Sequence, residues 1–309
     1  MKNSSQSILW AHIALFAVNM LYGASHILAK GVMPTYLTPT VFILFRVFGA
    51  TILFWIILLF SRNFKIERKD WIRLVGCGIF GVTVNQLFFF HGLNLSSSVN
   101  SGIIMAFNPI MVVILSAFAL RDKITPVRLS GIVIGAAGAV LLTLTGEKSV
   151  SQTSLGDLYL LINSFSYAIY LVLAKPLMKK YSPLLVITWV FTLGLGFLVL
   201  YPPVLTEFST TNFIAIPVDI WVKITYVVVG VTFLTYLLTM FGLKYLSPSV
   251  SSSYIYIQPI MVMGFAYVFL YLGIADDYTS SITLRKVIYM LLIFLGVYLS
   301  GRKEEIGGK

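Results

Sequence analysis

Apolar residues form long runs along the chain, and short polar segments separate these runs. Each run holds about 17–25 residues, which is enough for an α-helix to cross a hydrocarbon core of roughly 30 Å. The runs lie near residues 8–28, 38–60, 72–92, 97–120, 126–146, 156–175, 184–203, 220–243, 247–272 and 285–301. The pattern therefore predicts an all-α polytopic membrane protein with ten transmembrane helices.

The second half of the chain repeats residues of the first half at a nearly constant spacing. Leu-Ala-Lys at 28–30 recurs 145 positions later at 173–175, and Pro-Ile-Met at 109–111 recurs 150 positions later at 259–261. Two related halves with five helices each would lie inverted relative to one another in the membrane. We therefore expect a first five-helix repeat over 1–146, a linker over 147–155, a second five-helix repeat over 156–301 and a cytoplasmic tail over 302–309.

Charged residues make up only 11% of the 309 residues, against about 25% in an ordinary soluble domain. The net charge is +11, which in a soluble protein would suggest nucleic acid as a partner. With the N-terminus inside, however, sixteen lysines and arginines fall in inner segments and five in outer segments. The positive-inside rule then predicts that both termini are cytoplasmic, and it accounts for the charge without nucleic acid.

The sequence gives no support to several kinds of chemistry. It contains no P-loop for nucleotides, no His-Glu-x-x-His or clustered Cys/His pattern for a metal, and no Gly-x-Ser-x-Gly nucleophile turn. No carboxylate falls in the core of a predicted helix, so proton coupling would require His26, His91 or the solute itself. We therefore expect no cofactor, no metal and no enzymatic activity. The single cysteine, Cys77, is interpreted as a packing residue.

The first apolar run carries a polar stripe. Its members are spaced 7, 3, 4 and 4 positions apart, which places them along one side of a helix: His12, Asn19, Tyr22, His26 and Lys30. Polar side chains in a membrane helix turn towards protein or water rather than lipid. The stripe therefore indicates a wall that faces water or a solute.

Two lysines and one arginine are candidate cations of a transport path. Lys30 and Lys175, taken singly, are interpreted as residues that extend towards the membrane surface. Their recurrence at matched positions favours one cation near each mouth of a central path. Arg46 lies about eight residues inside the second run, roughly 12 Å deep at 1.5 Å per residue. It either locks neighbouring helices together or contacts the solute.

The fourth and ninth runs contain matched Asn108-Pro109 and Gln258-Pro259 pairs. Proline leaves the carbonyl four residues earlier, at Met105 and Ile255, without its usual helical donor. Such interruptions tend to line cavities in membrane proteins, although a simple packing kink is the alternative. Other polar residues within predicted spans are further candidates for the path: Gln86, Asn163, Tyr167, Tyr236 and Tyr254.

Small residues recur at four-residue spacing in the fifth and tenth runs. They are Gly131 and Gly135 in the fifth run, and Gly296 and Ser300 in the tenth. This spacing lets helix backbones approach closely. Packing inside one monomer and contact between two copies in a homodimer both fit the pattern.

Several motifs together resemble the EamA-type carriers of the drug/metabolite transporter superfamily. They are Leu-Tyr-Gly at 21–23 with Lys30, Phe-Arg at 45–46, Gly-Leu at 92–93, Asn-Pro-Ile-Met at 108–111, and the second-half segments 242–248 and 258–260. Tyr22 stands where that family usually has tryptophan, and Asp122 where it usually has glutamate. The resemblance implies two inverted five-helix repeats around a central cavity lined by helices 1, 3, 4, 6, 8 and 9. It also implies export from a bacterial cytoplasm.

The resulting hypothesis is a secondary transporter in the bacterial cytoplasmic membrane. It would export a small polar or amphipathic metabolite, amino-acid-like or drug-like, by alternating access. A lipid flippase or passive channel is an alternative, and a membrane enzyme acting on lipid-linked substrates is a weaker one.

Overall fold

The computed structural model describes residues 2–30, 32–33, 35–60, 65–95, 104–105, 107–121, 124–144, 154–272 and 284–301. Helices make up nearly all of this part of the chain, and none of its residues forms a strand. The α-helices are α1 (Lys2–Lys30), α2 (Pro39–Leu59), α3 (Trp71–Gly78), α4 (Val84–Leu95), α6 (Asn108–Leu120), α7 (Pro126–Leu144), α8 (Ser154–Met178), α9 (Pro183–Val199), α10 (Pro202–Thr210), α11 (Val218–Tyr226), α12 (Thr235–Tyr245), α13 (Pro248–Ser253), α14 (Gln258–Tyr271) and α15 (Leu284–Gly301). The all-α prediction is confirmed for the described residues.

Five helical segments are long and apolar enough to cross a membrane. They are Gln6–Ser25, Pro39–Leu59, Arg68–Leu95, Leu155–Met178 and Val218–Tyr245. A sixth is obtained if α9 and α10, which are bent by 77° at their junction, count as one span. Shorter apolar helices occur at Asn108–Leu120, Pro126–Leu141 and Val287–Ser300. The total of ten spans and the cytoplasmic position of both termini stay predictions.

Four helices begin with the same local signal, a hydroxyl residue followed by proline. Thr38, Thr125, Ser182 and Ser247 accept hydrogen bonds from the backbone N–H groups of residues 41, 128, 185 and 250. Each hydroxyl accepts a hydrogen bond from one of the backbone N–H groups that have no partner within the first turn of a helix. Proline has no N–H group, and at the first helical position this costs no hydrogen bond. These caps fix where α2, α7, α9 and α13 start.

Two π-helical turns interrupt long helices at corresponding places in the two halves. One, η2 (Ile79–Thr83), joins α3 to α4, and the other, η4 (Val227–Leu234), joins α11 to α12. The Thr83 hydroxyl donates to the carbonyl of Gly194 at 2.9 Å, and the Thr232 hydroxyl donates to that of Val227 at 2.9 Å. Such turns interrupt the regular helical hydrogen-bond pattern and often mark functional positions.

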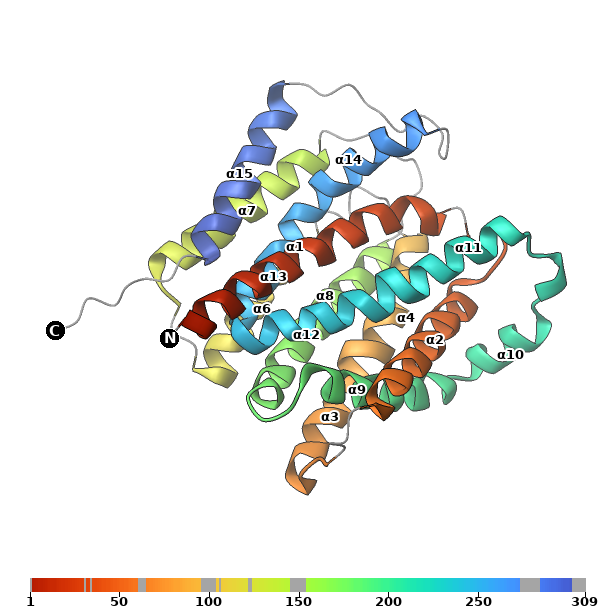
Figure 1. Cartoon of the computed structure of the whole chain (residues 1–309). Coiled ribbons are helices and arrows are strands. Elements are labelled where there is room, and N and C mark those ends of the chain that lie inside the picture. The colour runs from red at the N-terminus through yellow and green to blue at the C-terminus, as the bar shows by residue number, and fades with distance from the viewer. Residues whose placement is uncertain are drawn as a thin grey trace.

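Corresponding helices of the two halves exchange partners (Figure 1). Helix α1 packs on α12 and α14, whereas α8, its counterpart 145 residues on, packs on α4 and α6. In the same way α2 packs on η4, and α9 packs on η2. The two repeats are therefore interleaved rather than being separate bodies, and their contacts are related by an approximate twofold exchange.

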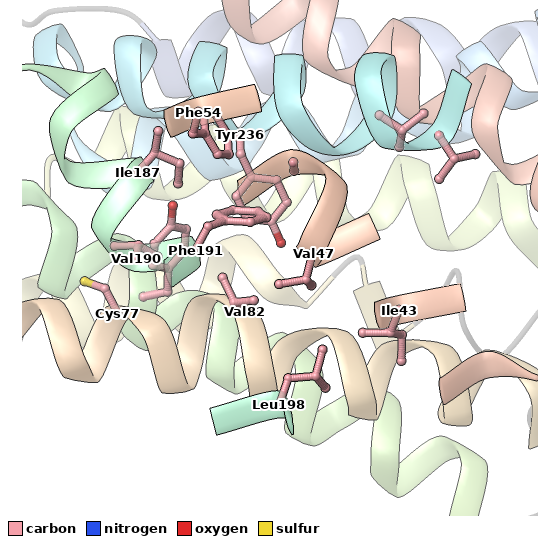
Figure 2. Close-up of a cluster of buried hydrophobic side chains, with 14 of the residues drawn as sticks. Ile43, Val47, Phe54, Cys77, Val82, Ile187, Val190, Phe191, Leu198 and Tyr236 are labelled. Atoms are coloured by element: carbon pink, nitrogen blue, oxygen red, sulfur yellow. The ribbon is translucent and has the colours of Figure 1, made fainter. Parts of the chain in front are cut away.

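The largest apolar cluster lies where α2, α9 and the π-helical turns meet. Figure 2 shows Ile43, Val47 and Phe54 of α2 beside Phe191 of α9 and Val82 of η2. All five side chains are fully buried. Cys77, labelled in the same view, is also fully buried there, which agrees with its interpretation as a packing residue.

The small residues of α7 and α15 pack against one another inside the monomer. The two helices cross at one side of the bundle (Figure 1). A methyl group added to Gly131 would lie 2.6 Å from the Ser300 nitrogen and 2.8 Å from the Gly296 oxygen. Of the two alternatives for this pattern, internal packing is the one observed. A homodimer stays a prediction, and these faces do not provide its interface.

Candidate functional site

A cavity of about 220 Å³ lies between the two interleaved halves. Its walls come from α1, α2, α4, α6, α8, η4, α12, α13, η5 (Tyr254–Ile257) and α14, so helices far apart in sequence meet around it. These include the spans that the family resemblance implies, and Arg46 and Pro39 of α2 contribute in addition.

Nine of the predicted site residues line this cavity. They are Asn19, Tyr22, Arg46, Gln86, Asn108, Asn163, Tyr167, Tyr236 and Gln258. The fold thus brings amide, phenol and guanidinium groups from seven helices to one cavity. Their contact with a solute stays a prediction.

Gln86 and Tyr236 occupy matched positions, 150 residues apart, and hydrogen bond directly to each other. The Gln86 Nε2 donates to the Tyr236 hydroxyl at 2.6 Å, and that hydroxyl lies 3.2 Å from the carbonyl of Gly81. Both side chains are buried. The pair therefore lies where the two repeats meet and couples α12 to η2 and α4.

A second matched pair of amides holds the interrupted helices against the opposite half. Asn108 Nδ2 donates to the backbone carbonyl of Ser164 on α8 at 2.8 Å, and Gln258 Nε2 donates to Asn19 Oδ1 on α1 at 3.0 Å. Asn108 and Gln258 are 150 residues apart, and Asn19 and Ser164 are 145 apart, so these contacts are repeat counterparts. Asn19 in turn donates to the carbonyl of Leu15 at 2.7 Å, which fixes its orientation.

The Gln258–Asn19 bond should contribute measurably to stability. In a double-mutant cycle of Gln258→Ala and Asn19→Ala, we expect a coupling free energy of about 0.5–1.7 kcal/mol, because interhelical hydrogen bonds in membrane proteins have this size. Thermal unfolding of the four purified proteins measures it. Strictly additive effects of the two substitutions would contradict the contact.

Helical geometry changes at both predicted proline positions. Helix α6 begins at Asn108, and α14 begins at Gln258 after the 3₁₀ turn η5, with Pro109 and Pro259 in their first turns. Met105 and Ile255, whose carbonyls the prolines were expected to release, both line the cavity. The Ile255 carbonyl accepts the N–H of Gln258 in a 3₁₀ bond, so the interruption is satisfied locally.

Five predicted residues do not contribute in the expected way, or are only partly described. Lys175 does not line the cavity; its Nζ lies 2.6 Å and 2.5 Å from the carbonyls of Leu243 and Leu246, at the end of α12. Tyr254 also lies outside the cavity lining, and its hydroxyl is 2.6 Å from the Nδ1 of His12. His26 and Lys30 belong to α1, but their side chains, like that of Pro259, lie outside the described part of the structure. The path role of these residues stays a prediction.

Arg46 is the cation within the described cavity lining. Its side chain is buried, with the guanidinium carbon 4.6 Å from the ring centre of Phe90 and 5.8 Å from that of Phe42. Its Nε donates to the Thr232 hydroxyl at 3.0 Å. In the described ranges, no carboxylate lies within 4 Å of it.

Sequence reasoning missed several residues of the lining. Ser25 lies three positions after Tyr22 on the polar stripe of α1, so the helical spacing could have found it. Asn94, at the end of α4, and the aromatic pair Phe89 and Phe90 carried no such signal, because aromatic residues are common throughout this chain.

The chemistry of this lining suits binding rather than bond making. It offers amides, hydroxyls, phenols and one guanidinium on an apolar background. Among the described residues, no three His, Cys, Asp or Glu side chains form a group that could hold a metal ion. The arrangement can hold a small polar molecule by hydrogen bonds and charge.

Known proteins similar to this chain agree with its architecture. The EamA-like transporter family matches residues 9–144 and again residues 154–302. The chain is 27% identical to the uncharacterized transporter YyaM of Bacillus subtilis, covering 93% of this chain and 92% of that protein. It is 27% identical to an uncharacterized transporter of Archaeoglobus fulgidus (87% and 91%) and 24% identical to the WAT1-related protein At4g30420 of Arabidopsis thaliana (55% and 54%). One crystal structure shares the fold with a TM-score of 0.72 over 96% of both chains, at 16% identity.

The family is named for transport rather than catalysis, and its two matches cover nearly the whole chain, so this multi-pass membrane protein belongs to the EamA-like transporter family.

Proposed function

We propose that the chain is a secondary transporter that exports a small polar or amphipathic metabolite across a bacterial cytoplasmic membrane by alternating access. The observation that carries the proposal is the cavity of about 220 Å³ between two interleaved repeats, lined by polar side chains from both. A cavity of this kind suits a small molecule, and its position between the two repeats supports the proposal, because inverted-repeat transporters bind their solutes at the repeat interface.

The exchanged contacts of the two repeats support alternating access. Each broken helix is held by one amide to the first helix of the other repeat, through Asn108 in one half and Gln258 in the other. If the halves are inverted, then a state in which they adopt each other's conformation opens the cavity to the opposite side. The two π-helical turns, at matched places beside the cavity, are natural points for this change.

Counterflow in liposomes tests this function. Purified protein is reconstituted, loaded inside with an unlabelled amino-acid or organic-acid mixture, and supplied outside with each labelled compound in turn. A transporter with alternating access is expected to give saturable uptake that the internal load accelerates. Linear, unaccelerated uptake would indicate a channel, movement of headgroup-labelled lipid a flippase, and turnover of a labelled lipid without movement a membrane enzyme. Each of these three results would overturn the proposal.

A bulky residue in the cavity should abolish this flux. Thr239 lines the cavity and is buried, so we expect Thr239→Trp to reduce the initial rate of counterflow at least about tenfold by filling the space. Phe118→Trp is the matched control, because Phe118 is 83% exposed on α6. Equal rates for the two variants, with both proteins folded, would show that the solute does not pass through this cavity.

A further inference from the structure

We infer that Arg46 anchors a carboxylate of the transported solute, and that the carbonyl oxygens of Gln86 and Asn108 accept hydrogen bonds from a donor group on the same molecule. The solute class is then a small carboxylate that also carries an ammonium or hydroxyl group. This inference rests on the proposed transport function and assigns the chemistry of its cavity.

Arg46 is incompletely paired. Its side chain is only 4% exposed, and Thr232 uses its Nε. The terminal nitrogens make no hydrogen bond to another described residue, and no carboxylate in that part of the chain lies within 4 Å. A buried charge normally has a counter-charge, because an unpaired one is destabilising. An anion that enters the cavity supplies the missing partner, and the planar fork of arginine matches a carboxylate.

The second repeat shows that the fold itself does not require a cation at this position. At the offset of 145 that relates Gly49 to Gly194, Arg46 corresponds to Phe191. Phe191 is fully buried in the apolar cluster, edge-on to Tyr236 at 4.8 Å between ring centres. One repeat thus fills this place with an aromatic ring, while the other turns a guanidinium to the cavity. This difference favours solute contact over the alternative that Arg46 only locks helices.

Two buried carbonyl oxygens of the lining residues have no hydrogen-bond donor. Gln86 Oε1 and Asn108 Oδ1 are buried, and neither has a hydrogen-bond partner in the described ranges. Both amide orientations are fixed from the other end, since Asn108 Nδ2 must face the Ser164 carbonyl and Gln86 Nε2 faces the Tyr236 hydroxyl. Each oxygen is therefore left as an acceptor on residues that line the cavity. An unpaired buried acceptor is destabilising until a donor reaches it.

Together these groups select for complementary chemistry. The described residues of the lining carry one fixed positive charge, two buried carbonyl acceptors without donors, the unpartnered hydroxyls of Ser164 and Ser251, and no acidic side chain. A cation would meet Arg46 without compensation, and a carboxylate without a donor would leave both acceptors unsatisfied. A molecule with both groups satisfies all three residues at once.

Binding of matched compounds to the purified full-length protein tests the inference. Each set has four forms: the 2-amino acid, the 2-hydroxy acid, the plain carboxylate and the amino-acid carboxamide. The sets carry the side chains of alanine, leucine, methionine and phenylalanine. A bound ligand raises the melting temperature of the folded protein, and the dependence on concentration gives its dissociation constant. We expect at least one amino or hydroxy acid to bind, and its carboxamide to bind at least about 30-fold more weakly.

Substitutions then assign the effect to Arg46. Arg46→Gln is expected to weaken binding of the same acid at least about 30-fold, whereas Arg46→Lys restores part of it. Without ligand, Arg46→Gln should melt close to wild type, because removing a buried charge that lacks a counter-charge offsets the lost hydrogen bond to Thr232 and the lost contacts with Phe90 and Phe42. Gln86→Leu should weaken binding of the amino or hydroxy acid more than binding of the plain carboxylate.

Several results would overturn the inference. They are equal binding of acid and carboxamide, no binding by any acid of the four sets, or unchanged binding by Arg46→Gln. If Arg46→Gln fails to fold, and Thr232→Val, which keeps the guanidinium, also fails to fold, then Arg46 stabilises helix packing through Thr232 and does not serve to bind the solute. Saturable counterflow of a solute without a carboxylate would uphold transport while overturning this assignment of Arg46, so the two failures are distinguishable.

Discussion

Replacing Gly296 by alanine is expected to destabilise the protein by about 1–3 kcal/mol or more, the range for overpacking a tight interior. The reason is the close crossing of α7 and α15. A methyl group at Gly296 would overlap the backbone of Gly135 and would lie 2.7 Å from the Gly131 oxygen. Backbone atoms cannot rotate away as a flexible side chain can, so the two helices must separate. Thermal unfolding of the purified protein, with recovery of folded material after membrane extraction, measures the effect.

A second glycine provides the control for this substitution. Gly196 also lies within a helix, α9, but apart from its chain neighbours and the backbone of its own helix no heavy atom lies within 4 Å of the methyl group that alanine would add. Gly196→Ala should therefore be neutral or stabilising by up to about 1 kcal/mol, because alanine loses less chain entropy than glycine in a helix. Equal melting temperatures for Gly296→Ala and wild type would contradict the packing of α7 on α15.

Local pattern was enough to predict much of this cavity. The stripe of α1 and the Asn-Pro and Gln-Pro breaks follow from helical spacing and from the missing N–H of proline, which act within a few residues. Asn19, Asn108 and Gln258 were found in this way, and all three line the cavity. The repeat offset of 150 also predicted that Asn108 and Gln258 correspond, and each donates a hydrogen bond to the first helix of the other repeat.

The contacts of other predicted residues could not be predicted from local spacing. Lys175 lies beside carbonyls at the end of α12, and Tyr254 lies against His12, because helices distant in sequence pack together there. The depth of Arg46 could be estimated from its position in an apolar run. That its guanidinium borders a cavity and lies against Phe90 depends on the packing of α2 against α4. Tertiary contacts of this kind leave no trace in the spacing of one segment.

The second large effect is expected at Asp70, which joins the two repeats at one end of the bundle. Asp70 lies at the start of α3, and its side chain is only 1% exposed. It accepts hydrogen bonds from Lys180 and the Tyr181 hydroxyl, each at 2.8 Å, and its other oxygen lies 3.4 Å from Arg73. Lys180 and Tyr181 follow α8, so this carboxylate connects the first repeat to the second.

Asp70→Asn is expected to lower the free energy of unfolding by about 1–3 kcal/mol, because it weakens hydrogen bonds that depend on a buried charge. Asp219 is the matched control: it lies in the first turn of α11, the helix that precedes the other π-helical turn. Its side chain is 67% exposed, and its ion pair with Lys223 is long, at 3.7 Å. Asp219→Asn should therefore change stability by no more than about 0.5 kcal/mol.

The pH dependence of this difference follows from Lys180. Its hydrogen bond with Asp70 raises the pKa of the Lys180 ammonium above its ordinary value. A raised pKa in the folded state means that the contribution of Lys180 to stability is fully present below the unfolded-state pKa, and is lost only as pH rises through the folded-state pKa. Between about pH 6 and 9 the melting-temperature difference between wild type and Asp70→Asn should therefore stay constant. Two results would show that Asp70 does not hold the repeats together at this end: equal effects of Asp70→Asn and Asp219→Asn, or a difference that vanishes within that range.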